Sequence, residues 1–189
     1  MSTEIEHAAT PLSALQISVR VVGLADLDGL IDGLAHAFRE TVNGGSPLGY
    51  LPPLSLEVAR EYWISVRPEL ESGARLLLVA LRDAAVVGSA QLSLSQRANS
   101  PHRATVEKVF TAPAMRGRGV GTALMLAAES VALQNGRTLL QLNTRHGQAA
   151  QRWYEALGYH LVGVIPGWTI GPGGERYDHV EMYKELKKF

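Results

Sequence analysis

Glycines and arginines alternate in one segment of this chain, Glu107–Thr122, which reads EKVFTAPAMRGRGVGT. The alternating residues are Arg116, Gly117, Arg118, Gly119 and Gly121. Glycines have no Cβ, so an anion can approach the backbone closely. A helical pattern begins at Val120, and the free N–H groups of its first turn would face that anion. Arginine adds fork-shaped donors that suit phosphate. The segment therefore predicts a binding site for a phosphorylated ligand.

Two well-known phosphate-binding loops fit this segment poorly. A dinucleotide fingerprint, Gly-x-Gly-x-x-Gly, would place its third glycine at position 122, which is Thr122. A P-loop requires a lysine followed by serine or threonine after its glycines, and no lysine follows here. A nucleotide-binding domain is therefore a disfavoured alternative.

The spacing Arg-x-x-Gly-x-Gly, at Arg116, Gly119 and Gly121, resembles the acyl-CoA pyrophosphate loop of the GNAT (Gcn5-related N-acetyltransferase) superfamily. Downstream, Trp153–Tyr159 (WYEALGY) is similar to a second signature of that family, Tyr-Glu-x-x-Gly-Phe/Tyr. The resemblance extends from about Val86 to the end of the chain. Within the superfamily, the segments ETVNGG, AQLSL and Pro-Gly at 40–45, 90–94 and 166–167 resemble the tabtoxin-resistance acetyltransferase branch.

This resemblance implies acetyl-CoA as the co-substrate, and it assigns residues to it. The pantetheine arm would bind along the strand that precedes the glycine loop, and a backbone N–H there would polarise the acetyl carbonyl. The loop itself would bind the diphosphate. The implied contacts are Val109, Phe110 and Thr111 for the arm, Arg116, Gly117, Arg118, Gly119, Val120, Gly121 and Thr122 for the diphosphate, and Asn143 and Tyr154 beside them.

A base must take the proton of the acceptor amine, and Glu107 is the carboxylate best placed to help. It lies two residues before Val109 on the same predicted strand, so the two side chains should share a face. The alternative is a rim carboxylate or an ion pair with a neighbouring arginine. Relatives often place their acid where this chain has Thr105, and the tabtoxin-resistance branch has an aspartate where this chain has Asn143. Asn143 can orient a water or an amide but cannot take a proton.

Tyr154 is the candidate for protonating the departing CoA thiolate. A phenol with an ordinary pKa of about 10 stays protonated at neutral pH and can donate as negative charge develops. The alternative is a packed aromatic residue whose hydroxyl is satisfied locally.

Two loops, Gly44–Tyr50 and Trp168–Arg176, are candidates for the acceptor pocket, with Glu40, Tyr50 and Trp168 as contacts. They could equally be surface loops. The histidines are scattered without metal-ligand spacing, so no metal site is expected.

The remaining pattern predicts an α/β (α+β) fold with a mixed, mostly antiparallel central sheet of about seven strands flanked by four helices. This is the element order of the GNAT fold. A glycine-rich connection is expected at Gly167–Gly174. The predicted strands are Leu15–Val22, Arg75–Arg82, Val86–Ser95, His102–Thr111, Thr138–Thr144, Tyr159–Ile165 and Tyr177–Leu186, and the predicted helices are Ala25–Val42, a short one between Pro53 and Pro68, one from Val120 to about Asn135, and Gln148–Leu157.

Composition narrows the functional classes. The 189 residues include 18 acidic and 18 basic ones without a basic block, which argues against nucleic acid as a partner. With no cysteine, the chain can form neither disulfides nor an acyl-cysteine intermediate. No membrane span or signal peptide is recognised, so a cytoplasmic protein is expected. We expect a flexible tail at 1–12 and a single domain at 13–189.

These observations predict an N-acetyltransferase that moves an acetyl group from acetyl-CoA directly to an amine in a ternary complex. The acceptor would be a small molecule, for example an antibiotic or an amino-acid-like toxin. The alternatives are a peptide or protein N-acetyltransferase and a non-catalytic acyl-CoA sensor. GNAT proteins are commonly dimers, so the resemblance also allows a homodimer.

Overall fold

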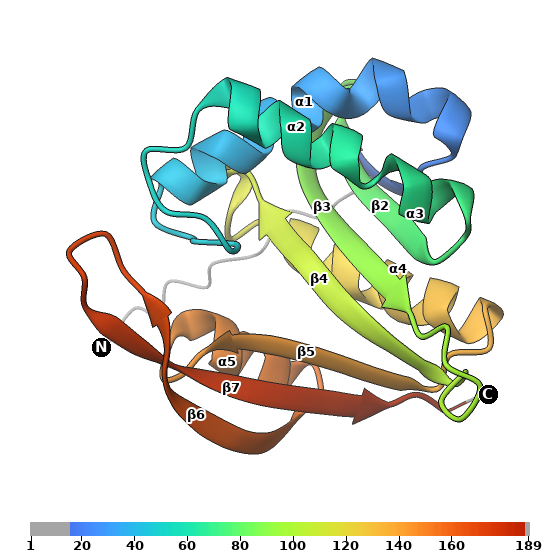
Figure 1. Ribbon diagram of the computed structural model, residues 1–189. Helices are drawn as coiled ribbons and strands as arrows, with labels where there is room; N and C mark the ends of the chain where they lie inside the picture. The colour runs from blue at the N-terminus through green and yellow to red at the C-terminus, as the bar shows by residue number, and fades with distance from the viewer. Residues whose placement is uncertain (1–15, 188–189) are drawn as a thin grey trace, which may run out of the picture.

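A computed structural model describes residues 16–187 of the chain. The tail predicted at 1–12 lies outside this range, and the single domain predicted at 13–189 stays a prediction. One seven-stranded sheet runs through the structure (Figure 1). The strands are β1 (Ile17–Val21), β2 (Arg75–Arg82), β3 (Ala85–Leu94), β4 (Arg103–Thr111), β5 (Leu139–Arg145), β6 (His160–Ile170) and β7 (Arg176–Glu185).

The strand order is β1-β2-β3-β4-β5-β7-β6, and β4 and β5 are parallel neighbours, whereas all other neighbours are antiparallel. A parallel pair needs a crossover, and the helix that follows the glycine loop provides it. The predicted mixed, mostly antiparallel sheet is confirmed. The helices are α1 (Leu24–Asn43), α2 (Leu56–Ser65), α3 (Arg67–Glu71), α4 (Val120–Gln134) and α5 (Ala149–Ala156).

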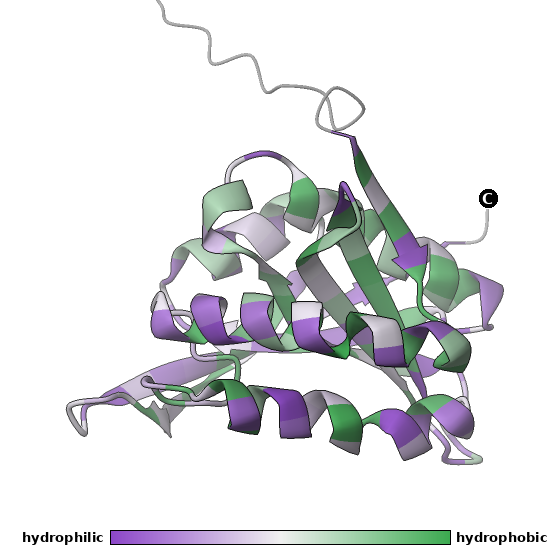
Figure 2. Ribbon diagram, turned by 90° about the horizontal axis from the view of Figure 1, so that it is seen from above, coloured by the Kyte–Doolittle hydropathy of each residue, from purple (hydrophilic) through white to green (hydrophobic). Residues whose placement is uncertain are grey.

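Helices cover both faces of the first half of the sheet, which explains the nearly continuous apolar run of β2. Leu77 and Val79 pack into a core cluster with α1 and α2, while Leu78 and Ala80 pack into a second cluster with α4. Figure 2 shows the central strands mostly in the green of apolar residues and the surrounding helices banded with polar purple. Alternate residues of one strand thus serve two cores.

Of two predicted boundaries, one is confirmed and one was wrong. The short helix predicted to stop before Pro68 does so, since α2 ends at Ser65, and the unpredicted α3 follows at once because proline is tolerated in the first turn of a new helix. The glycine-rich connection predicted from Gly167 begins later, since β6 continues to Ile170 and only Gly171–Glu175 forms the turn. The four predicted helices are present, and α3 is an additional short one.

Candidate functional site

The central strands β4 and β5 separate along their length. They pair only where Arg103–Thr105 lies beside Leu139–Gln141. Beyond this, β4 stays bonded to β3 and β5 stays bonded to β7. In Figure 1 the two strands meet near the C-terminus and diverge toward the opposite end. We call the diverging segments, 106–111 of β4 and 142–145 of β5, the β4–β5 split. Its facing backbone edges can bind an extended ligand as an added strand would bind.

A β-bulge at Lys108 accompanies the split. Gln91 of β3 lies opposite Glu107, whereas Ser89, two residues back, lies opposite Phe110, so β4 carries one extra residue. Lys108, which has a positive φ of 48°, lies at this bulge. As a result Val109 packs against the α4 side and Phe110 against the α1–α2 side. The expectation that Glu107 and Val109 share a face was wrong, because the bulge interrupts the alternation.

Glu107 lies on the α1–α2 side and is held in an ion pair. The Arg75 guanidinium donates to its Oε2 at 2.7 Å, and also contacts Glu69 at 2.8 Å and the fully buried Gln91. The side chain of Arg75 is only 10% exposed and that of Glu107 is 35% exposed. This geometry matches the alternative role considered for Glu107, an ion pair with a neighbouring arginine, and the arginine comes from β2.

Lys108 connects the bulge to the loop between α1 and α2. Its Nζ donates to the carbonyl oxygen of Leu48 at 2.8 Å and lies 5.7 Å and 5.2 Å from the ring centres of Tyr50 and Tyr62. Burial lowers the pKa of the Lys108 ammonium; the charge of Glu107 acts in the opposite direction, and the smaller effect of Arg75 lowers it further. The predicted acceptor contact Tyr50 therefore lies beside the bulge.

The glycine loop has the geometry of an anion site. A 3-10 turn over Pro113–Met115 leads into it, and Gly117 and Gly119 have positive φ values of 71° and 79°. Gly119 is the N-cap of α4, and the N–H of Ala123 donates to its carbonyl oxygen at 3.0 Å. A glycine cap offers no side chain to the N–H groups of the first turn, at 120–122. These donors and the positive end of the helix dipole therefore face outward together.

Neighbouring elements fix this loop. A Cβ on Gly121 would lie 3.2 Å from the indole of Trp153 and 3.5 Å from Thr111 Oγ1, so only glycine fits without displacement. Trp153 Nε1 also donates to Thr122 Oγ1 at 3.3 Å. From the other side Arg116 donates to Ser46 Oγ at 3.3 Å. Arg118 is exposed. The predicted diphosphate residues thus gather at the start of α4.

Tyr154 lies in the core cluster on the α4 side and is 7% exposed. Its ring centre lies 4.7 Å from that of Trp153 and 5.8 Å from that of Tyr159. Burial raises the pKa of the Tyr154 phenol well above its ordinary value. The hydroxyl therefore stays protonated at neutral pH, as the predicted role requires, and it is also a weaker acid than a free phenol.

Asn143 is exposed on β5 within the split, and it lies opposite Glu181 of β7. Their neighbours in the sheet, Leu142 and Met182, are buried in the cluster with α4. Since side chains alternate along a strand, Asn143 and Glu181 point to the opposite face. Thr105 lies before the split, where β4 and β5 still pair.

Sequence reasoning missed the polar residues of β7. His179 is 7% exposed, and Trp168 of β6 covers it with ring centres 5.6 Å apart. Burial lowers the pKa of the His179 imidazole, while the charge of Glu181 acts in the opposite direction. The alternation His-Val-Glu-Met at 179–182 is the signal that could have placed His179 and Glu181 on one face.

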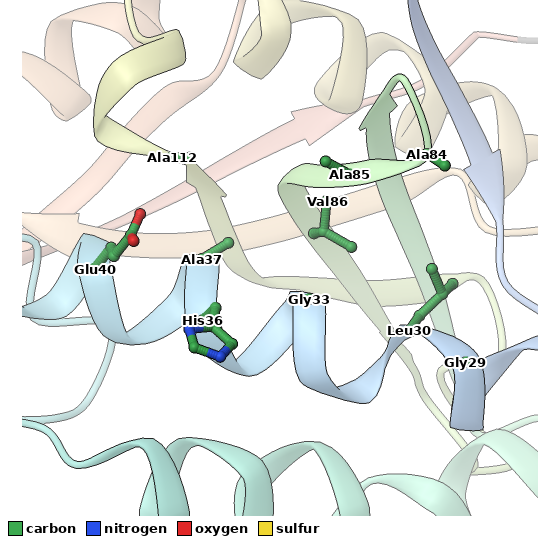
Figure 3. Close-up of a pocket in the computed structure, with 10 residues that line it drawn as sticks. All are labelled: Gly29, Leu30, Gly33, His36, Ala37, Glu40, Ala84, Ala85, Val86 and Ala112. Carbon is green, nitrogen blue, oxygen red and sulfur yellow. The ribbon is translucent and has the colours of Figure 1, made fainter.

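The predicted acceptor contacts do not all meet. Glu40 lines a separate hollow of about 310 Å³ between α1 and the β2–β3 hairpin, together with His36 and Gly33 (Figure 3). Trp168, in contrast, packs on His179, and His179 shares the face of Glu181 and Asn143. Trp168 therefore lies on the same face of the sheet as Asn143. Over residues 16–187, no group of three potential metal ligands was found, and no helix is long and apolar enough to cross a membrane.

Comparisons with known proteins agree with this geometry. The profile of the acetyltransferase (GNAT) family matches residues 45–159. An uncharacterised N-acetyltransferase of Methanocaldococcus jannaschii is 35% identical over 66 residues, which cover 34% of this chain and only 29% of that relative. The fold also resembles two solved structures.

One is a GCN5-related N-acetyltransferase from Kribbella flavida, with 27% identity, a TM-score of 0.71 and coverage of 90% of this chain and 98% of the other. The second, from Salmonella typhimurium, is described as an acetyltransferase with its cofactor acetyl-CoA; identity is 18%, the TM-score is 0.70, and 92% and 96% of the two chains are covered. Because the family profile matches more than half of the chain, the chain belongs to the GNAT acetyltransferase family.

Proposed function

We propose that this protein transfers an acetyl group from acetyl-CoA directly to the primary amine of a small molecule, within a ternary complex. The observation that supports this most is the position of the β4–β5 split beside the uncapped start of α4. The split offers backbone groups to an extended pantetheine arm, and the helix start offers N–H donors to a diphosphate. A structure of similar fold holds acetyl-CoA.

In the proposed reaction the amine nitrogen attacks the thioester carbon, a nitrogen–carbon bond forms, and the carbon–sulfur bond breaks. Backbone N–H groups near Val109 and Phe110 would donate hydrogen bonds to the carbonyl oxygen and stabilise its developing negative charge. The chain has no cysteine, so an acyl-cysteine intermediate on the enzyme cannot form. A single direct transfer is therefore the simplest route.

Tyr154 would stabilise the leaving thiolate. A thiol has an ordinary pKa of about 8.5, so a buried phenol with a raised pKa is a weaker acid than the thiol it would protonate. Full proton transfer from Tyr154 is therefore uphill. We propose that it donates a hydrogen bond to the sulfur, and that the proton of the released thiol comes from the acceptor amine.

The acceptor belongs to the proposal. The small-molecule class, and within it an antibiotic or amino-acid-like toxin, is proposed from the resemblance of segments 40–45, 90–94 and 166–167 to the tabtoxin-resistance branch. A role in resistance in the cytoplasm is proposed with it. An amine on a peptide or protein is the alternative acceptor. A non-catalytic acyl-CoA sensor is the alternative of another class.

A homodimer is a further part of the proposal. Within the described residues, β6 is an edge strand of the sheet, and Leu161, Val162, Val164 and Ile170 on it are between 41% and 67% exposed. Light scattering at several protein concentrations would measure the mass. A mass of one chain at all concentrations would refute a dimer.

The central test combines calorimetry with a CoA-release assay. We expect acetyl-CoA to bind, and thiol to appear when amino acids, aminoglycosides or peptides with free amines are added. Binding without thiol release above the amine-free background would support the sensor. Release with peptides alone would support the peptide acceptor, and no binding of acetyl-CoA would refute the proposal.

A further inference from the structure

β7 presents polar side chains to the face of the sheet opposite α4. Leu142 and Met182 face each other inside the α4 core, so the next pair along, Asn143 and Glu181, projects the other way. Asn143 belongs to the β4–β5 split. Glu181 therefore lies one strand away from the backbone edge that is proposed to hold the thioester.

The two carboxylates near the split differ in their surroundings. Glu107 is paired with Arg75 at 2.7 Å. For Glu181, by contrast, no lysine or arginine of residues 16–187 comes within ion-pair distance. A carboxylate without a cation partner attracts an ammonium group and can accept a proton from it.

A second observation beside Glu181 points to a ligand. His179 precedes it by two residues, so both side chains share a face. Its imidazole is 7% exposed, and neither ring nitrogen has a hydrogen-bond partner within the described part of the chain. A neutral imidazole has one donor and one acceptor, and burying both unpaired is unfavourable because each loses its hydrogen bond to water. A ligand or a water bound at this face would supply the missing partners.

Aromatic side chains complete this face. Between Ile165 and Thr169 the register of β6 and β7 shifts, and this bulge contains Trp168, which lies over His179 and is 57% exposed. The guanidinium of Arg145 on β5 lies 3.9 Å from the ring centre of Tyr177 on β7. Exposed indole faces attract organic cations, and a primary amine is such a cation in neutral water.

We propose that Glu181 binds the acceptor as its ammonium ion and takes its proton, in place of Glu107, with His179 as a neutral hydrogen-bonding neighbour. This inference rests on the proposed acetyl transfer. One proton moves from the ammonium nitrogen to the Glu181 carboxylate and then to solvent. The neutral amine attacks the thioester carbon, and as the carbon–sulfur bond breaks, a second proton from the same nitrogen ends on the thiol.

The test compares Glu181→Gln with Glu185→Gln. Glu185 lies on the same strand opposite Leu139, where β4 and β5 still pair, so it is a matched control. A positioned base contributes about 100-fold to 10,000-fold. We expect Glu181→Gln to lower kcat/KM by at least about 100-fold near pH 7, with acetyl-CoA affinity unchanged, and Glu185→Gln to change neither.

The pH profile separates proton transfer from a structural role. An alkyl ammonium loses its own proton near pH 10, so the ratio of wild-type to Glu181→Gln rates should narrow to less than about 10-fold there. Arg145, His179 and Tyr183 flank Glu181 on β5 and β7, and all three are present in both proteins, so the variant differs from the wild type only in the Glu181 carboxylate. A pH-independent loss would overturn the inference, because it would indicate damage to the fold or pocket.

The two proposals fail in different ways. Turnover by the wild type with unchanged turnover by Glu181→Gln would overturn the role of Glu181 and leave acetyl transfer intact. No turnover by the wild type with any amine, despite bound acetyl-CoA, would refute both. Loss of turnover in Glu181→Gln, normal cofactor binding and recovery at high pH together would support the inference.

Discussion

The guanidinium of Arg75 lies 2.7 Å from the Glu107 carboxylate, although 32 positions separate the two residues in the sequence. The pair joins the start of β2 to the middle of β4 across β3, and Arg75 also donates to the buried side chain of Gln91 on β3. Breaking a well-buried ion pair by removing one partner costs about 3–5 kcal/mol, and partial exposure of Glu107 reduces this. Glu107 therefore has a structural role whether or not it touches the acceptor.

Glu107→Gln tests this role. Because the amide keeps the shape and still accepts from Arg75 but loses the charge, we expect the free energy of unfolding to fall by about 1–2 kcal/mol. Turnover should fall by less than about 10-fold. Urea unfolding and steady-state kinetics measure the two effects. A loss of turnover of about 100-fold or more at unchanged stability would instead identify Glu107 as the base.

Gly119→Val tests the diphosphate loop. Valine is disfavoured at a φ of 79° and brings bulk to the start of α4, so acetyl-CoA affinity should fall at least about 100-fold. Gly136→Val is the matched control, because Gly136 follows the other end of the same helix with a φ of 72°. Calorimetry should give near-normal affinity for this control despite a similar loss of stability. Equal affinities in the two variants would exclude the loop as the cofactor site.

Tyr154→Phe tests the hydrogen bond to the leaving sulfur. Since removal of one charge-stabilising hydrogen bond costs about 1.5–3 kcal/mol, kcat should fall by about 10-fold to 100-fold while acetyl-CoA still binds. Tyr159→Phe, in the adjacent buried ring 5.8 Å away, is the control and should keep kcat. Stopped assays at saturating acetyl-CoA measure both. Full activity in Tyr154→Phe would remove Tyr154 from the reaction and leave it as a packed aromatic residue.

His179 predicts a pH dependence of stability. Burial lowers its pKa, so below its ordinary pKa of about 6.5 the unfolded chain binds more protons than the folded one. Stability from this residue is therefore present above about pH 6.5 and is lost as the pH falls through the lowered folded value. His179→Gln should flatten this part of the profile in urea unfolding, whereas substitution of the exposed His160 by Gln should not. An unchanged profile in His179→Gln would contradict a buried neutral imidazole.

The sequence by itself determined the parts of the site that depend on local chemistry. Gly117 and Gly119 have the positive φ values that their residue type allows, and the pattern from Val120 gives α4. Because backbone N–H groups and a helix start make this site, a short segment contains almost all the information. Apolar runs likewise gave the strands and the mixed sheet, since burial follows side-chain periodicity.

Tertiary structure alone decided the surroundings of the side chains. The sequence pattern predicts a regular strand at β4, but the bulge at Lys108 puts Glu107 and Val109 on opposite faces. The partner of Glu107, Arg75, comes from another strand through sheet register, which no local pattern encodes. Glu181 meets Asn143 for the same reason. Contacts between strands distant in sequence depend on register and bulges, so they could be found only in the folded chain.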